Sequence, residues 1–337
     1  MTPWALICSG QGNQDENMFA WFESNSSAQA LKKRALEENW LPSEAAGALA
    51  AGVKLSKSVL EKNIQPLICL FQQMVWASLE NKAPDPRLVA GYSLGELSAC
   101  GCAGALSPAD VVRLAGIRTA CMEAACKSGG MVAVLGLERK DIENICSNTG
   151  ISKLPCPDRA PIQDQNAYIA IINGQRHFIL GGLREKLDAL AEACRRAGAE
   201  RVVQLSVPVP SHTPFMSAAR APWRAAVDKA AFRQAKIPLL AGVDAHKLVE
   251  PSSIRENLVR HLCEPVRWDE CLAAMIEEGC RVFFELGPGR ALANMIMNQY
   301  PGVQARALCE FKTPEGAREW ISTAVSRAHH FGGGDII

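Results

Sequence analysis

One serine lies between two glycines in a spacing that many enzymes use to expose a nucleophile. Gly91, Ser93 and Gly95 form the pattern G-x-S-x-G, with "RLVA" before it and "ELSACGCAGA" after it. These flanks predict a strand, a sharp turn and a helix, so the serine hydroxyl would project outward. The N–H of Leu94, at the helix start, could then donate to a developing oxyanion. The pattern predicts a catalytic serine; the alternative is an ordinary glycine-rich turn with a capping serine.

A nucleophilic serine needs a general base, and the chain has six histidines. His212 follows the segment "VPVPSH", in a proline-bounded loop between an expected strand and an expected helix. Such a rigid loop is a suitable place for a fixed base. We therefore place His212 first, and the alternative is a structural loop histidine. The other candidates lie in an expected strand, a turn, a helix and the tail, and they are His177, His246, His261, His329 and His330.

A third member of a catalytic triad is not obvious. Asp158 and Asp164 lie between the serine and the histidine in the sequence, but in an expected loop, and Asp244 is a further candidate. A Ser–His dyad whose histidine is oriented by main-chain carbonyls fits equally well.

The elements around these residues alternate between expected strands and helices, which indicates an α/β protein. Residues 4–8 predict a buried strand that leads into a glycine-rich turn, and the apolar spacing predicts helices between residues 27 and 79. Ser107 and Pro108 are typical of the N-cap and first position of a helix, and that helix carries Arg118.

The middle of the chain has a different order of elements. Residues 130–203 predict β-α-β-β-α-β, the ferredoxin-like pattern, with a hairpin turn at Asn173 and Gly174. We expect this segment to be a small domain inserted into a larger body formed by residues 1–129 and 204–325. Residues 326–337 would form a tail.

The composition excludes several classes of protein. The 337 residues carry 36 basic and 35 acidic side chains, for a net charge of +1, so neither nucleic acid nor a membrane surface is an expected partner. The 13 cysteines are scattered and form no zinc-type array, which predicts buried free thiols and no metal site. The first ten residues lack the features of a signal peptide, so we expect a cytoplasmic protein.

Several motifs together resemble the malonyl-CoA:acyl carrier protein transacylases and the acyltransferase domains of fatty acid and polyketide synthases. In chain order they are "SGQGNQ", "GYSLGELSA", "VVRLAGIRTACM", "VPVPSH", "EPVRW" and "FFELGPG". The resemblance covers about residues 4 to 325. It implies an α/β-hydrolase-like large domain with an inserted ferredoxin-like small domain.

The resemblance also implies roles for individual residues. Ser93 would carry the acyl group as an ester, and His212 would activate first Ser93 and then the incoming thiol. The main-chain N–H groups of Gln11 and Leu94 would form the oxyanion hole. Arg118 would pair with the free carboxylate of malonate, because a guanidinium can bind a carboxylate through two hydrogen bonds.

Two supporting residues are implied with less direct chemistry. Asn173 lies near an asparagine that the family has in its small-domain strand. Arg267 is at the position where the family has a main-chain carbonyl that orients the histidine. Cys8-Ser9 and Tyr92 depart from the usual motifs, since the family has Phe-Pro before the first glycine and a histidine before the nucleophile.

The function implied is malonyl transfer from coenzyme A to an acyl carrier protein, by a ping-pong mechanism through a seryl ester. The "PSH" before the base resembles stand-alone malonyl transferases more than the methylmalonyl-selective synthase domains, so the resemblance implies a malonyl rather than a methylmalonyl group. Malonyl-CoA enters as a substrate, no other cofactor is expected, and a monomer is the simplest state. The alternatives are an editing acyl-thioester hydrolase, the malonyltransferase subunit of malonate decarboxylase, and an inactive scaffold with the same fold.

Overall fold

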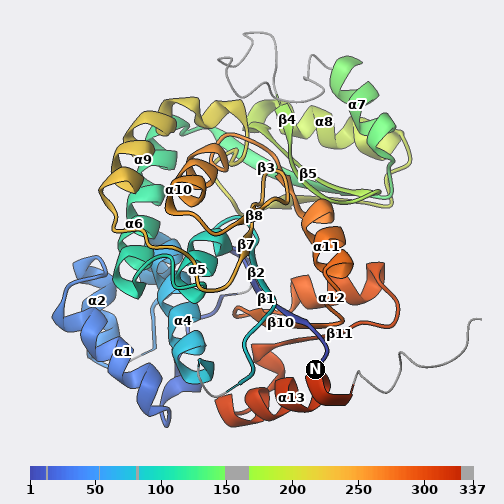
Figure 1. Cartoon of the computed structure of the whole chain (residues 1–337). Coiled ribbons are helices and arrows are strands. Elements are labelled where there is room, and N and C mark those ends of the chain that lie inside the picture. The colour runs from blue at the N-terminus through green and yellow to red at the C-terminus, as the bar shows by residue number, and fades with distance from the viewer. Residues whose placement is uncertain (13, 53, 81–82, 149–166, 328–337) are drawn as a thin grey trace, which may run out of the picture.

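The computed structural model describes residues 1–12, 14–52, 54–80, 83–148 and 167–327. The described residues form two β-sheets surrounded by helices (Figure 1). The larger sheet has the order β11-β10-β1-β2-β7-β8. Its strands pair in parallel, except that β8 pairs antiparallel with β7. They are β1 (Trp4–Cys8), β2 (Leu88–Gly91), β7 (Leu239–Leu240), β8 (Lys247–Leu248), β10 (Val282–Leu286) and β11 (Gln304–Ala307).

The central strands of this sheet are buried on both faces. All residues of β1, β2 and β10 are buried, as expected for parallel strands that helices cover on both sides. Side chains alternate between the faces, so Leu6 packs into one core and Ile7 into another. The core that contains Leu6 includes residues of α4, α5, α6, α9, α10 and α13, and the core that contains Ile7 includes residues of α11 and α12.

The helices that follow β1 confirm the helical region predicted between residues 27 and 79. They are η1 (Met18–Phe22), α1 (Ser26–Glu37), α2 (Ser43–Ala50), α3 (Lys57–Lys62) and α4 (Ile64–Leu79). The remaining helices of the large body are α5 (Gly95–Cys102), α6 (Pro108–Ala125), η2 (Pro214–Met216), α9 (Ser217–Lys229), α10 (Pro251–Arg260), α11 (Trp268–Glu277), α12 (Ala291–Gln299), η3 (Leu308–Glu310) and α13 (Pro314–Arg327). The predicted cap of α6 is confirmed, because the Ser107 hydroxyl accepts from the N–H of Asp110 at 3.1 Å.

The smaller sheet has the order β6-β3-β5-β4-β9. Its strands are β3 (Gly129–Leu135), β4 (Ala167–Gly174), β5 (His177–Leu183), β6 (Arg201–Leu205) and β9 (Val266–Arg267), and only the β4–β9 pair is parallel. The helices α7 (Arg139–Asn148) and α8 (Arg184–Arg196) lie on its outer side (Figure 1). The predicted order of strands and helices is therefore present, with β9 added from a distant part of the chain.

The predicted hairpin turn at Asn173 and Gly174 is wrong. Both residues belong to β4, and the turn lies at residues 175–176. The register of β4 against β5 shifts between Ile172 and Gly174, which places Asn173 in the sheet with its side chain buried. The rest of the fold buries the Asn173 side chain in the sheet, and this packing outweighs the local preference of an Asn-Gly pair for a turn.

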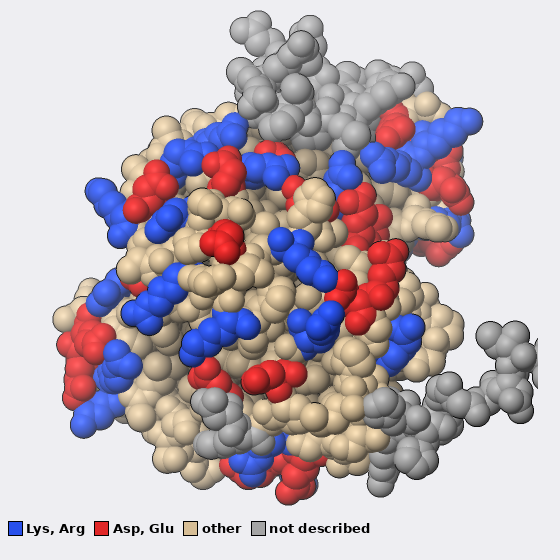
Figure 2. Space-filling view, in the orientation of Figure 1, with Lys and Arg blue, Asp and Glu red and all other residues tan. Residues whose placement is uncertain are grey.

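One hydrophobic core joins the two sheets. Ala5 and Ile7 of β1 belong to the same cluster as Met131 of β3 and Ile171 of β4. On the face shown in Figure 2, Lys and Arg side chains are interspersed with Asp and Glu, as the balanced charge suggests. Within the described part of the chain, no helix combines the length and the apolar character needed to cross a membrane.

Candidate active site

The strand–turn–helix predicted around Ser93 is confirmed, because β2 ends at Gly91 and α5 begins at Gly95. Ser93 has a φ of 55°, in the left-handed region that non-glycine residues seldom occupy. A Cβ atom at Gly91 would lie 2.2 Å from the nitrogen of Glu96, and one at Gly95 would lie 2.0 Å from the Cys8 carbonyl oxygen. The two glycines are therefore required by the tight packing of the turn against α5 and β1.

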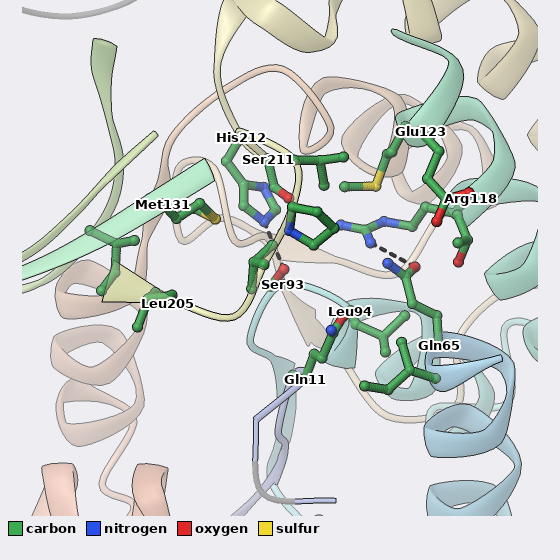
Figure 3. Close-up of a pocket in the computed structure, with 18 of the residues that line it drawn as sticks. Gln11, Gln65, Ser93, Leu94, Arg118, Glu123, Met131, Leu205, Ser211 and His212 are labelled. Atoms are coloured by element: carbon green, nitrogen blue, oxygen red, sulfur yellow. Dashed lines mark hydrogen bonds between the residues drawn. The ribbon is translucent and has the colours of Figure 1, made fainter. Parts of the chain in front are cut away.

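Ser93 and His212 are in direct contact. The Ser93 Oγ lies 2.7 Å from the His212 Nε2 (Figure 3). His212 is buried and also has a positive φ, of 61°, and its main-chain N–H donates to the Leu262 carbonyl at 3.1 Å. Two residues held in strained backbone conformations are thus brought into hydrogen-bond contact, an arrangement that suits a nucleophile and its base.

The tautomer of His212 follows from its second hydrogen bond. Its Nδ1 lies 2.6 Å from the main-chain carbonyl oxygen of His261, which can only accept, so Nδ1 carries the proton. Nε2 is then free to accept the proton of Ser93. Burial lowers the pKa of His212 well below its ordinary value, and the nearby His261 and Arg118 act in the same direction. His212 is therefore a neutral base at neutral pH.

The role predicted for Arg267 is wrong, because the carbonyl that orients His212 belongs to His261. The N–H of Arg267 donates to the Gly242 carbonyl at 2.7 Å, and its guanidinium donates to Glu270 at 2.9 Å. Asp244 is not a triad member either, because its Oδ2 accepts from Arg260 at 2.8 Å. Asp158 and Asp164 lie outside the described residues.

The loop after β1 packs against the nucleophile turn. A Cβ atom at Gly10 would lie 2.9 Å from the Tyr92 carbonyl oxygen, so the two backbones touch. Buried Gln72 fixes this loop, since its Nε2 donates to the carbonyls of Ser9 at 2.8 Å and Leu286 at 2.7 Å. Gln11 and Leu94 both line the cavity, on the side of Ser93 opposite His212 (Figure 3). This arrangement suits an oxyanion hole made of their main-chain N–H groups.

Arg118 lies at the other end of the cavity and is only 4% exposed. Its Nη1 donates to the Gln65 Oε1 at 2.9 Å, whereas its Nη2 is buried and has no hydrogen-bond partner among the described residues. Burial lowers the pKa of Arg118 to about 10, so the side chain stays charged at neutral pH. A buried cation with an unused donor can be stabilised by a carboxylate bound in the cavity.

The cavity between these groups has a volume of about 140 Å³. Its apolar wall comes from the small sheet, through Met131, Ile179 and Leu205. In Figure 3, Met131 and Leu205 lie on one side of the Ser93–His212 pair and Arg118 lies on the other. The cavity therefore places a small acyl group between the nucleophile and a cation.

Asn173 and Tyr92 lie beside the cavity. Asn173 is 1% exposed, and its main-chain carbonyl accepts from the Gln299 side chain at 2.8 Å. Burial raises the pKa of Tyr92 to about 12, and a hydrogen bond from Asn173 opposes this shift. The Tyr92 ring packs edge-on against Trp268, with 5.4 Å between ring centroids. Asn173 thus supports the residue before the nucleophile, and Tyr92 fills the space as a neutral phenol.

The sequence did not reveal three further residues of the site: Gln65, Gln72 and His261. Both glutamines are buried in the largely apolar helix α4, and a buried polar residue in such a helix is a signal for a specific hydrogen bond. His261 acts through its carbonyl, so its residue type carried no such signal. Over the described ranges, no group of three or more His, Cys, Asp or Glu side chains could hold a metal ion.

Comparison with known proteins agrees with this geometry. A family model described as "Acyl transferase domain" matches residues 5–311. The chain belongs to this family. The acyl transferase chain is 28% identical over 318 residues to a protein named malonyl CoA-acyl carrier protein transacylase from Salmonella typhimurium, covering 92% of this chain and 97% of that protein. A protein of the same name from Escherichia coli K12 is 29% identical over 322 residues, with 92% and 97% covered.

Solved structures show the same fold. The acyl transferase chain superposes with a TM-score of 0.81 on a malonyl-transacylase solved in complex with a type II polyketide synthase acyl carrier protein, at 27% identity and over 94% of this chain and 99% of that one. The malonyl CoA-acyl carrier protein transacylase of Coxiella burnetii gives 0.79, at 28% identity and over 97% and 98% of the two chains. The mixed α/β fold is therefore confirmed.

Proposed function

We propose that this acyltransferase moves a malonyl group from malonyl-CoA to the thiol of an acyl carrier protein. The observation that carries the proposal is the buried guanidinium of Arg118, whose Nη2 is unsatisfied in the same small cavity as the Ser93–His212 pair. A substrate with a free carboxylate supplies the missing acceptor. The names of the relatives and the transacylase–carrier complex support the same substrates.

In the first half-reaction, His212 takes the Ser93 proton on Nε2 as Oγ attacks the thioester carbon. The developing oxyanion is stabilised by the N–H groups of Gln11 and Leu94. When the carbon–sulfur bond breaks, the imidazolium returns its proton to the sulfur and coenzyme A leaves as a thiol. Arg118 holds the malonyl carboxylate throughout, so the ester stays in position after the larger part of the substrate has departed.

In the second half-reaction, His212 takes a proton from the thiol of the carrier arm, and the thiolate attacks the ester carbon. Ser93 leaves and recovers its proton from His212. A covalent intermediate is useful because two bulky thiol carriers use one cavity in turn. The reaction requires neither a metal nor a cofactor beyond malonyl-CoA as substrate.

We also propose a division of the chain into a large body and an inserted small domain. Residues 1–129 and 204–325 form an α/β-hydrolase-like body, and residues 130–203 form a ferredoxin-like insert. The strand order β6-β3-β5-β4 supports this division of the chain. We place the enzyme in the cytoplasm as a monomer.

Intact-mass measurement tests this function directly. Malonyl-CoA should add one malonyl group to the protein, acetyl-CoA should add little, and Ser93→Ala should abolish the adduct. A holo acyl carrier protein should remove the group and become malonylated. If the adduct decayed in water alone as fast as it does with the carrier protein, the result would instead favour the thioester hydrolase. Discharge only by the thiol-bearing carrier subunit of a malonate decarboxylase would favour that complex.

A further inference from the structure

A buried acid lies behind the catalytic histidine. Glu96, in the first turn of α5, is 2% exposed. Its Oε1 accepts from the Gly242 N–H at 2.8 Å and from the Asn257 side chain at 2.7 Å. Its Oε2 lies 2.7 Å from the Nδ1 of His261. The carboxylate therefore has partners on three different segments, and His261 is the one nearest to the base.

His261 contacts His212 in two ways. Its main-chain carbonyl accepts from the His212 Nδ1, and its ring lies 4.6 Å from the His212 ring between centroids, tilted by 60°. His261 is 3% exposed, and its Nε2 has no hydrogen-bond partner in the described part of the chain. A shift of the His261 backbone would therefore move the carbonyl that orients His212, and a change of its rotamer would move the ring that packs against His212.

We propose that Glu96 and His261 are positioning residues for the Ser93–His212 pair. Glu96 fixes the His261 ring through its Nδ1, and the His261 carbonyl holds His212 in the tautomer that removes the Ser93 proton. Both side chains are buried, and a buried polar group left without a partner would be strongly unfavourable, so the contact between Glu96 and His261 should hold both in place. This inference rests on the proposed acyl transfer.

The side chains around His212 also affect its pKa. His212 faces Ser93 from the nucleophile turn, Arg118 from α6 and His261 from the end of α10, and behind His261 lies Glu96 of α5. Cys271 of α11 lies near Glu96, and burial raises the pKa of this thiol, so it stays neutral. His261 is one of the two neighbouring side chains, with Arg118, that lower the pKa of His212. Replacing the His261 imidazole should therefore raise the pKa of His212.

The test compares His261→Gln with His261→Leu. Both keep the main-chain carbonyl and remove the imidazole, but only the glutamine amide can donate a hydrogen bond to Glu96. The measurements are the single-turnover rate of malonyl-ester formation on Ser93 and the KM for malonyl-CoA, at pH values on both sides of about 6.5, the ordinary histidine pKa.

We expect the leucine variant to lose roughly 10-fold or more in rate, with KM changed less than about twofold, because the base and not the substrate site is disturbed. The glutamine variant should recover to within about threefold of the wild type at alkaline pH. In both variants the acid limb of the pH profile should move to higher pH.

Trp223→Phe is the matched control. The Trp223 indole N–H donates to the Leu258 carbonyl of α10 at 2.9 Å, so the substitution removes a buried hydrogen bond from the same helix without touching His212. It should lower the melting temperature and leave the rate per folded molecule and the pH profile unchanged.

Three outcomes would overturn the inference: variants with wild-type rates, an unshifted pH profile, or a glutamine variant as slow as the leucine variant. If the leucine variant does not fold, the glutamine profile alone decides, because an unshifted acid limb would refute the effect of the His261 ring on the pKa of His212. Absence of an ester on the wild-type protein would instead refute the proposed function.

Discussion

At the scale of the residue, the chemistry depends on charges and neutral bases held away from water. Arg118 is the clearest case, because it is buried, charged and only partly hydrogen-bonded by the protein. Its interaction with a bound carboxylate would form in a site of low dielectric, where such hydrogen bonds are strong.

Replacing Arg118 with Ala should reduce the rate of malonyl-ester formation on Ser93 by roughly 100-fold, since truncating one partner of a buried charge pair costs several kcal/mol. The rate with acetyl-CoA should change much less, because an acetyl group has no free carboxylate for Arg118 to bind. Arg113→Ala, on the exposed side of the same helix, is the control and should affect neither rate. Equal losses for malonyl and acetyl groups would refute the carboxylate-binding role.

The lowered pKa of His212 predicts the pH dependence of the first half-reaction. Because the neutral base persists as the pH falls through about 6.5, ester formation should stay near its maximum there and decline only at lower pH. The same shift affects stability. The unfolded state binds the additional proton between the two pKa values, so the free energy of unfolding should fall as the pH drops below about 6.5. Half-maximal ester formation at or above the ordinary histidine pKa would contradict this prediction.

The sequence singled out Ser93, His212 and Arg118, which the structure brings to one cavity, because motifs fix their residue types and spacing. It did not predict His261, because a main-chain carbonyl can come from any residue, and it assigned this role to Arg267 instead. Nor did it predict the partnership of Glu96 with His261, since two residues so far apart in the chain meet only when α5 and α10 pack together.

At the scale of the element, the nucleophile turn tolerates almost no additional atoms. Gly95→Ala should abolish ester formation, because the new Cβ would lie 2.0 Å from the Cys8 carbonyl oxygen and would separate α5 from β1. The reactive Ser93 could not then keep its distance from His212.

Gly116→Ala, in the middle of α6, is the matched control. A Cβ atom there meets no atom within 4 Å, so this variant should retain activity and gain about 0.5–1 kcal/mol of stability from the better helix former. Chemical denaturation and ester formation would be measured on both variants. An active Gly95→Ala protein would show that the turn has more room than its packing indicates.

Helices and strands were predicted where a long sequence pattern supported them. They were missed where only contacts with distant parts of the chain determine the secondary structure. The helices α6 and α8 follow from apolar spacing and capping residues. The two-residue strand β9 has no pattern of its own, and only its pairing with β4 makes it a strand.

At the scale of the whole molecule, buried carboxyl groups away from the site also influence stability. Glu285 of β10 is 1% exposed, and burial raises its pKa from 4.5 to about 7, although the N–H groups of Ala293 and Leu292 oppose the shift. The folded state therefore binds the additional proton between pH 4.5 and pH 7. This contribution to stability is complete below that range and is lost as the pH rises through it.

Glu285→Gln should remove this pH dependence, because the amide stays neutral and can still accept from Ala293. Relative to the wild type, the variant should gain in free energy of unfolding as the pH rises from below 4.5 to above 7. Urea denaturation at both ends of the range measures the difference. A constant difference between the two proteins would show that Glu285 does not titrate on folding.

The strand β9 joins the small sheet to the chain segment that follows His261. Its residues Val266 and Arg267 pair with Ile171 and Ile172 of the small sheet, and they follow His261 in one short segment of the large body. A motion that separated the small sheet from the body would pull this segment and draw the His261 carbonyl away from His212. In such an opened state His212 would lose its orientation, and the malonyl ester would resist attack by water while the carriers exchange.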